Sequence, residues 1–196
     1  PYIIAELGVN HDGSVARAME MVEAAADAGA DAVKFQLFRA DLLMSRASRL
    51  AAYQAKAGEA DPVSMLRRLE LSTEQLSPLV ARAHALGIHA IVTVFSVDLV
   101  AAAESLPWDA YKTASPDVVH RPLLAALAAT GRPMIVSTGA AEFEEVERAV
   151  SWLSGATDRL ALLQCVSSYP TEPRDAAMGG MEQLRTLPGL SGRVGY

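Results

Sequence analysis

Residues 28–37 read AGADAVKFQL, and this stretch decides the fold. A segment with helical periodicity stops at Gly29, and a run of strand length follows that is apolar except at Lys34 and Gln36. A glycine after the last helical turn, followed at once by extended apolar sequence, is typical of a helix that leads into a buried parallel strand. Similar helix-glycine-strand transitions recur along the chain, so we interpret the sequence as a series of βα units.

Apolar runs and amphipathic segments alternate over the whole chain. The expected strands are Tyr2 to Leu7, Ala32 to Phe38, His89 to Phe95, Ala110 to Ala114, Met134 to Thr138, Leu160 to Val166, and a last one that begins at Arg193. The expected helices are Val15 to Ala28, which Ser14 can cap, Ser77 to Leu86, Arg121 to Thr130 and Glu142 to Leu153. The stretch 39–74 is long for a βα loop, but residues 45–57 and 62–71 have helical composition, so we expect a lid or an oligomer contact there.

Seven successive strands joined by right-handed crossovers fit either a closed (β/α)8 barrel or an open doubly wound sheet. We favour the barrel because no glycine-rich phosphate loop follows the first strand. An eight-unit barrel usually takes about 250 residues, whereas this chain has 196 and stops inside the seventh strand. We therefore expect residues 1–196 to form a single, truncated TIM-barrel domain of the α/β class, either a fragment or the ordered part of a longer protein. It would hold about six βα units and the start of strand seven.

The composition argues against several classes of protein. The chain is 51% hydrophobic and 20% charged, with a formal net charge of -6, as in an ordinary soluble domain that would repel nucleic acid. No apolar run reaches the roughly 20 residues of a membrane helix, and no cationic leader precedes a cleavage site. The single cysteine, Cys165, suits a reducing, cytoplasmic compartment and argues against a cysteine-built zinc site.

Only three of the 17 cations are lysines, and two of them, Lys34 and Lys112, interrupt apolar strands. Because strand side chains alternate, Lys34 and Gln36 share one face, which points to the mouth of a barrel. A buried ammonium needs a partner, so each lysine should either pair with an acid such as Glu6 or bind an anionic ligand. Other polar residues stand near the carboxyl ends of strands, where such folds carry their active sites: Thr93, Ser137, Thr138 and Gln164. Two lysines among hydroxyls favour a phosphate or carboxylate site, in which an adjacent carboxylate can move protons.

The segment Gly8 to Gly13 follows the first strand, and its glycines permit a tight turn before a helix. Asn and Asp at a turn are more often turn formers than ligands, which leaves His11 as a solvated side chain. The remaining histidines lie on predicted helices or at their boundaries, without a second ligand at a useful spacing. We therefore predict no metal ligands within these residues.

Five blocks of the sequence, taken in order, resemble the sialic acid synthase family: residues 5–13 (AELGVNHDG), 28–36 (AGADAVKFQ), 111–115 (YKTAS), 137–139 (STG) and 163–170 (LQCVSSYP). The likeness spans the whole chain. Members of that family are (β/α)8 barrels that condense phosphoenolpyruvate with an N-acetylated amino sugar, N-acetylmannosamine or a related sugar, and release phosphate. The resemblance implies a transferase of sialic acid biosynthesis that makes a nonulosonic acid.

The resemblance also implies roles for particular residues. Glu6, Lys34 and Lys112 would form the catalytic set, with Glu6 as the carboxylate that handles protons or orients water. The phosphate and the carboxylate of phosphoenolpyruvate would be held by Lys34, Thr93, Lys112, Ser115 and Ser167. Gln36 and Tyr169 would face the sugar. The remaining substrate-binding positions are Ser137, Asp117, where the family places a second acid, and Gln164, where many bacterial members have histidine.

The same resemblance implies a divalent metal, manganese or else magnesium or cobalt, that would polarise the sugar aldehyde. Its two histidine ligands lie on the seventh and eighth strands of the family, after residue 196, so we expect the chain as it stands to lack a complete metal site and activity. The family's C-terminal antifreeze-like domain, which reaches over a partner's barrel, is also absent from these residues. We expect a cytoplasmic homodimer.

Two other interpretations stay open. A Schiff-base aldolase on the same barrel would use Lys34 or Lys112 as a desolvated nucleophile. A barrel without activity, retained as a binding module, is the alternative outside enzymology.

Overall fold

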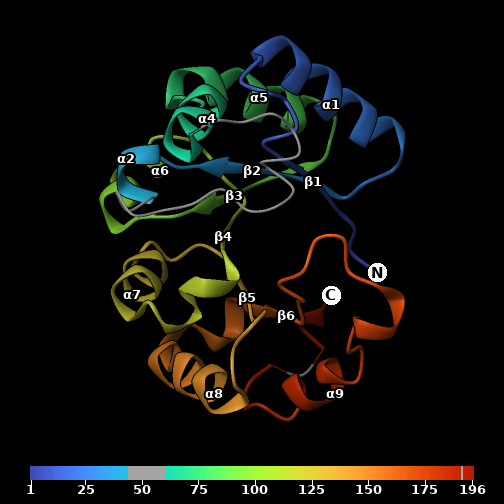
Figure 1. Cartoon of the computed structure of the whole chain (residues 1–196), viewed down its shortest axis with the longest axis vertical. Helices are drawn as coiled ribbons and strands as arrows, with labels where there is room; N and C mark the ends of the chain where they lie inside the picture. The colour runs from blue at the N-terminus through green and yellow to red at the C-terminus, as the bar shows by residue number, and fades with distance from the viewer. Residues whose placement is uncertain (44–60, 191) are drawn as a thin grey trace. The chain divides into compact units, whose positions relative to one another are not determined.

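Seven strands form the framework of the computed structural model, which describes residues 1–43, 61–190 and 192–196. The strands are β1 (Ile4–Gly8), β2 (Ala32–Leu37), β3 (His89–Val94), β4 (Ala110–Thr113), β5 (Met134–Ser137), β6 (Leu160–Leu163) and β7 (Val194–Gly195). They follow one another in one sheet in the order of the sequence (Figure 1). An open doubly wound sheet would reverse this order at a switch point, so the uninterrupted order confirms the predicted α/β fold of the TIM-barrel type.

The strands begin and end within a few residues of their predicted limits. β1 begins at Ile4 rather than Tyr2, because the Ile3 amide donates to the Asp31 carboxylate at 2.6 Å instead of to a neighbouring strand. The last predicted strand residue is missing from several strands, and β6 ends three residues early, at Leu163. The turns that follow β2 to β6 therefore begin earlier in the sequence than the apolar pattern predicts.

The longer helices also follow the prediction. They are α1 (Val15–Asp27), α4 (Pro62–Leu69), α5 (Thr73–Ala85), α7 (Arg121–Ala129) and α8 (Phe143–Trp152). Ser14 caps α1 by accepting the Arg17 amide at 3.2 Å, as predicted. α5 starts four residues before the predicted Ser77, because Ser72 and Gln75 form a capping box.

Short elements escaped the sequence analysis, and one expected helix lies outside the described residues. The short helices are α2 (Ala40–Leu43), α6 (Val100–Ala103) and α9 (Gly180–Leu184), and the 3-10 segments are η1 (Val97–Leu99), η2 (Ser115–Val119), η3 (Ser154–Arg159) and η4 (Pro173–Asp175). Elements of three to six residues carry too little periodicity to be recognised. The helix expected within residues 45–57 falls outside the described part of the chain.

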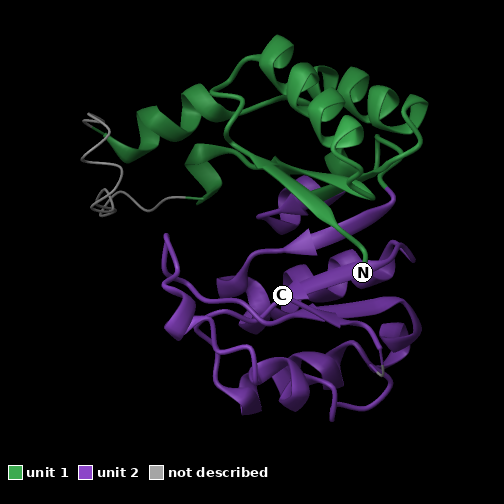
Figure 2. Cartoon of the chain, turned by 90° about the vertical axis from the view of Figure 1, so that its right-hand side faces the viewer, with its two compact units in different colours: residues 1–92, 101–108 green, residues 93–100, 109–196 purple. Residues whose placement is uncertain are grey.

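Residues 1–92 and 101–108 form the first of two compact units (Figure 2). β1 and β2 pair in parallel there, with Glu6 opposite Lys34. α1 and α5 pack against each other, and Figure 1 shows both on the same side of β1, β2 and β3. Phe35 and Trp108 are fully buried with ring centroids 5.9 Å apart, so the apolar face of β2 is the one that enters the core.

Residues 93–100 and 109–196 form the second unit (Figure 2). β4 pairs with β5, β5 with β6 and β6 with β7, all in parallel. α7 and α8 pack against each other, and their apolar stripes are buried. Parallel strands end at the same edge of a sheet, so the residues after β4, β5 and β6 come together there. Among the described residues, no helix combines the length and the apolar character that crossing a bilayer requires.

Candidate active site

Lys34 is buried in the first unit, with Glu6 as its partner. The register of β1 and β2 sets the two residues side by side, and Lys34 Nζ lies 2.6 Å from Glu6 Oε2. Lys34 is only 3% exposed, whereas the Glu6 side chain is 53% exposed. Burial lowers the pKa of Lys34, and the charge and hydrogen bond of Glu6 oppose that shift. Lys34 is thus paired with an acid, the first of the two possibilities expected for it, and solvent reaches its carboxylate partner.

A bulge in β1 makes room for the Glu6 carboxylate. The pairing shifts register between Glu6 and Gly8, and Gly8 has a φ of +51°. A Cβ atom on Gly8 would lie 3.0 Å from Glu6 Oε1 and 3.8 Å from Gln36 Nε2. The structure therefore brings Glu6, Lys34 and Gln36 together at the carboxyl ends of β1 and β2, as their predicted positions require.

His11 was predicted to be solvated, and this was wrong, because its side chain is 3% exposed. Its Nδ1 accepts the Gly13 amide at 3.0 Å. Burial lowers the His11 pKa, although the Gly8 backbone and the charge of Asp12 act in the other direction. The signal that the sequence analysis passed over is a histidine between two glycines that both need positive φ.

In the second unit, Lys112 donates to a buried serine. Its Nζ lies 2.5 Å from Ser137 Oγ and 3.2 Å from the Thr113 carbonyl oxygen. β4 pairs with β5 so that Lys112 faces Ile135, two residues before Ser137, and Ser137 is 1% exposed. The ammonium group of Lys112 is thus held at the carboxyl ends of β4 and β5, a setting that suits an anion.

Two further serine hydroxyls, those of Ser115 and Ser167, both lie close to Gly139. A Cβ atom at this position would lie 2.8 Å from Ser115 Oγ, 2.9 Å from Ser167 Oγ and 3.1 Å from Cys165 Cβ. The loops after β4, β5 and β6 each contribute one of these groups. The structure thus brings the predicted residues Ser115 and Ser167 together, and only a glycine leaves both hydroxyls in place. Gly139 entered the sequence analysis only as part of a resembling block.

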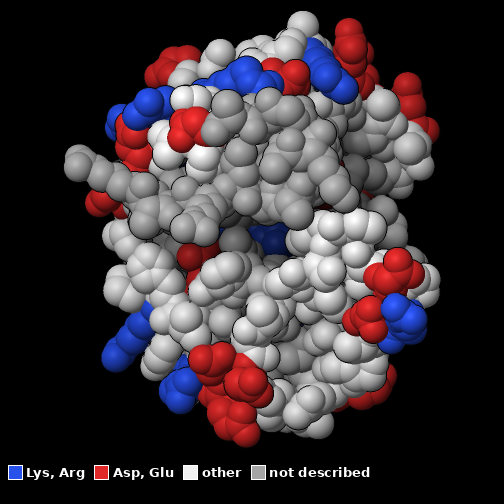
Figure 3. Space-filling view, in the orientation of Figure 1, with Lys and Arg blue, Asp and Glu red and all other residues white. Residues whose placement is uncertain are grey.

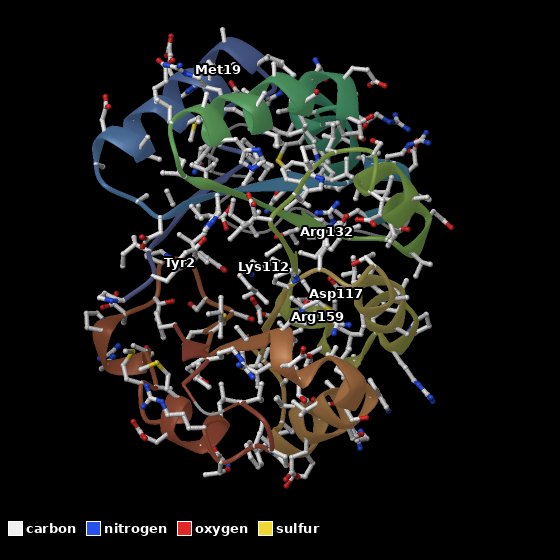
Figure 4. All side chains as sticks on the ribbon, turned by 180° about the vertical axis from the view of Figure 1, so that it is seen from behind. Tyr2, Met19, Lys112, Asp117, Arg132 and Arg159 are labelled. Carbon is white, nitrogen blue, oxygen red and sulfur yellow. The ribbon has the colours of Figure 1, made fainter. Side chains whose placement is uncertain are left out.

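Asp117 lies on η2, directly after β4, and Figure 4 labels it together with Lys112 of β4. Its Oδ1 is 3.8 Å from His120 Nδ1. Burial raises the pKa of Asp117, while His120, the Ala114 backbone and Lys112 oppose that shift. A carboxyl group with a raised pKa holds a proton more readily near neutral pH than an exposed one, so Asp117 is suited to proton transfer.

Three predicted residues have other surroundings. The amide of Gln164 lies against Gly180 of α9 and lines, with Thr138 and Cys165, a cavity of about 170 Å³. Tyr169 is 82% exposed. Thr93 is buried, and its Oγ1 has no hydrogen-bond partner in the part of the chain that the structure describes. The substrate roles of all three stay predictions.

Acidic side chains gather on part of the surface of the second unit (Figure 3). Figure 3 shows acidic side chains gathered over α8, whose first turn carries Glu144 and Glu145. The negative charge of the whole chain therefore does not argue against an anion site, because Lys34 and Lys112 stand on strands, where local charge outweighs a distant and screened one.

Residues 21–196 match the model of the NeuB family. The chain is 36% identical over 190 residues to N,N'-diacetyllegionaminic acid synthase of Legionella pneumophila, covering 93% of this chain and 53% of that protein. It is 28% identical to N-acetylneuraminate-9-phosphate synthase of Mus musculus, covering 95% of this chain and 52% of that protein. The crystal structure of N-acetylneuraminic acid (sialic acid) synthetase from Leptospira borgpetersenii, in complex with citrate, superposes with a TM-score of 0.87 at 30% identity, covering 100% of this chain and 64% of that one. The chain thus spans about half the length of the curated relatives it matches.

Proposed function

The chain belongs to the NeuB family, and we propose that the whole protein condenses phosphoenolpyruvate with an N-acetylated amino sugar to a nonulosonic acid and phosphate. The observation that carries the proposal is the set of donors in the second unit. Lys112 bonds Ser137, and the hydroxyls of Ser115 and Ser167 meet over Gly139. One ammonium and several hydroxyls in a small space suit a phosphoryl or carboxylate group.

The predicted residues would have different roles in the reaction. Lys112 and the serine hydroxyls would hold the anionic groups of phosphoenolpyruvate and keep its phosphate ready to leave. Lys34 would add a second positive charge, and Glu6, paired with it at 2.6 Å, would accept the proton of an attacking water. Gln36 and Tyr169 would face the sugar, with Thr93, Asp117 and Gln164 as further substrate-binding residues.

The reaction forms one carbon–carbon bond and breaks one carbon–oxygen bond. The enol carbon of phosphoenolpyruvate attacks the aldehyde carbon of the sugar, and the aldehyde oxygen takes up a proton. Water then adds to the neighbouring carbon and gives its proton to the Glu6 carboxylate. The resulting tetrahedral carbon releases phosphate and becomes the ketone of the product. Positioned cations are effective in such a reaction because negative charge moves onto the departing phosphate.

The resemblance to sialic acid synthases also implies a divalent metal, with manganese as the first candidate. Within residues 1–43, 61–190 and 192–196, no group of three or more His, Cys, Asp and Glu side chains could hold a metal ion. The described residues therefore do not fit the metal, and none of the steps above depends on it. A manganese requirement of the whole protein, its homodimeric state and its cytoplasmic location are further proposals, which chelation, mass measurement in solution and fractionation would test.

The whole protein, incubated with phosphoenolpyruvate and a panel of N-acylated amino sugars, should form one nonulosonic acid and one phosphate per turnover, detected by mass spectrometry and a phosphate assay. Activity without phosphoenolpyruvate, or a covalent adduct after borohydride reduction, would contradict the proposal and favour a Schiff-base aldolase.

Lys112→Met should weaken phosphoenolpyruvate binding in calorimetry by more than about 30-fold, because it removes a charge partner of the anion. Arg174→Met is the matched control, since Arg174 is a cation of the same unit whose side chain is 84% exposed. An unchanged affinity of Lys112→Met, or an equal loss in Arg174→Met, would reject the assigned site.

A further inference from the structure

The 3-10 segment η2, which directly follows β4, carries Asp117 and His120 on the same side. The Asp117 amide donates to the Ala114 carbonyl oxygen at 3.0 Å, and the His120 amide donates to the Asp117 carbonyl oxygen at 2.8 Å. Because a 3-10 helix has three residues per turn, side chains three positions apart lie one above the other. Asp117 Oδ1 accordingly lies 3.8 Å from His120 Nδ1.

The two side chains differ in their access to solvent. The Asp117 side chain is 17% exposed, whereas the His120 side chain is 42% exposed. The backbone of His120 is fixed by α7, since its carbonyl oxygen accepts the amides of the buried residues Leu123, at 3.0 Å, and Leu124, at 3.1 Å. His120 is thus held beside Asp117 and is itself open to solvent.

The proposed reaction requires an acid besides Glu6. The aldehyde oxygen of the sugar takes up a proton when the carbon–carbon bond forms, whereas Glu6 takes a proton from water and is the ion-pair partner of Lys34. Asp117 lies two residues after Ser115, at the carboxyl end of β4. Burial raises the pKa of Asp117, so its carboxyl group keeps a proton to higher pH than an exposed one.

We propose that Asp117 protonates the aldehyde oxygen of the sugar and that His120 acts through Asp117, as the positioning residue that returns a proton to it from solvent. This inference rests on the proposed function, and it adds the acid and the path by which that acid is recharged. In this role Asp117 touches the reacting oxygen and His120 does not.

The protons balance in each turnover. The O–H bond of the Asp117 carboxyl group breaks as the new sugar hydroxyl forms, which leaves a carboxylate. His120 Nδ1 then gives its proton to Asp117 Oδ1, and Nε2 takes one from solvent. The proton that Glu6 receives from water offsets the one that Asp117 gives up. Catalytic hydrogen bonds tighten when the substrate is bound, which closes the gap of 3.8 Å between the two side chains.

Lys112 of β4 and His120 are the charged groups that act on Asp117, both in favour of its carboxylate form. η2 also packs against β5, α7 and α8, and β5, with the sequence MIVS, carries no titratable residue. In α7, Arg121 lies over the ring of Trp152, 5.8 Å from its centroid. The titratable residues of α8 are Glu144, Glu145, Glu147 and Arg148. Histidine is the side chain that readily gains and loses a proton near neutral pH, which suits His120 to the transfer.

Steady-state kinetics of the whole protein test the relay. His120→Ala should lower kcat about 30-fold, with KM for phosphoenolpyruvate changed less than threefold, and added imidazole should restore most of the lost kcat. His120→Asn keeps a hydrogen-bonding group beside Asp117 but cannot take up a proton, so its kcat should be about as low. His84→Ala is the matched control, because His84 is an exposed histidine of α5, in the first unit. It should keep its full kcat and gain nothing from imidazole.

A double variant shows whether His120 acts through Asp117. Asp117→Asn should lower kcat at least about 100-fold, and imidazole should not restore it. Asp117→Asn combined with His120→Ala should be no slower than Asp117→Asn alone, because without the acid there is no group left to recharge. A merely structural role of His120 would instead give additive losses.

Three results would overturn the proposal: a kcat of the folded His120 variants within threefold of the wild-type value, a loss in His120→Ala that imidazole does not relieve, or additive losses in the double variant. Melting temperatures show whether each variant is folded. If His120→Ala does not fold, His120→Asn decides, alone and combined with Asp117→Asn. Failure of the proposed function is distinct, because the wild-type protein would then form no product.

Discussion

At the scale of single residues, Thr93 and Thr113 form an informative pair. Both are buried near the carboxyl ends of strands, and among the described residues neither Oγ1 has a hydrogen-bond partner. An unpartnered buried hydroxyl costs free energy that an isosteric valine avoids. Such a hydroxyl does not help the folded protein unless a bound ligand supplies the missing hydrogen bond. Of the two threonines, only Thr93 was predicted to bind substrate.

Thr93→Val and Thr113→Val should therefore differ in function but not in stability. Each should raise the free energy of unfolding by about 1 kcal/mol, or the melting temperature by about 3 °C, because the unsatisfied hydroxyl is gone. Only Thr93→Val should weaken phosphoenolpyruvate binding, by about tenfold in calorimetry. Equal affinities of the two variants would remove Thr93 from the site.

At the scale of elements, the loop between β5 and α8 decides whether the serine hydroxyls can meet. Ser137 ends β5, Gly139 follows two residues later, and Ala140 has a φ of +57°. This loop brings Gly139 close to Ser115 and Ser167, which follow the neighbouring strands β4 and β6. A residue with strained backbone beside such close contacts is common in ligand-binding loops.

Gly139→Ala should lower the affinity for phosphoenolpyruvate at least tenfold, because its Cβ atom would push both hydroxyls apart. Gly155→Ala is the matched control, since no atom lies within 4 Å of the equivalent Cβ position. Calorimetry on both variants, with melting temperatures as a check of the fold, measures the effect. Full affinity in Gly139→Ala would show that the hydroxyls do not bind the anion together.

At the scale of the whole molecule, contacts between distant segments hold the site residues in place. Gly13 meets the carbonyl oxygen of Arg68, 55 positions later in the chain, and Arg68 also pairs with Asp12. The Ala40 amide donates to Glu70 Oε1 at 2.6 Å. The segment that includes α4 is therefore fastened to the turn that carries His11, within the first unit.

Comparing the stabilities of Gly13→Ala and Gly29→Ala distinguishes the energy of this packing from the energy of backbone strain. Both glycines have positive φ, +75° and +81°, but only a Cβ atom on Gly13 would overlap a backbone atom. Gly29→Ala should cost about 1 kcal/mol of unfolding free energy, from the strain of the left-handed conformation alone. Gly13→Ala should cost about 1 to 3 kcal/mol more, because a backbone carbonyl cannot move aside cheaply. Equal losses in thermal denaturation would contradict the packing.

The sequence was a good guide wherever a feature is local. The helix-glycine-strand transition at Gly29, the cap at Ser14 and the alternation that puts Lys34 and Gln36 on one face all follow from interactions within a few residues. His11 was misjudged for the opposite reason. Its burial depends on the conformations of Gly8 and Gly13, which the composition of a turn does not specify.

The sequence by itself determined the α/β class, the order of the strands and the positions of the polar residues at their carboxyl ends, because periodicity and capping act over short distances. Only the tertiary structure decided that the hydroxyls of Ser115 and Ser167 both lie close to Gly139, that Gln164 lies against Gly180 and that the buried His11 accepts the Gly13 amide. These contacts join residues through packing and hydrogen-bond geometry that depend on the folded backbone, and no local pattern encodes such geometry.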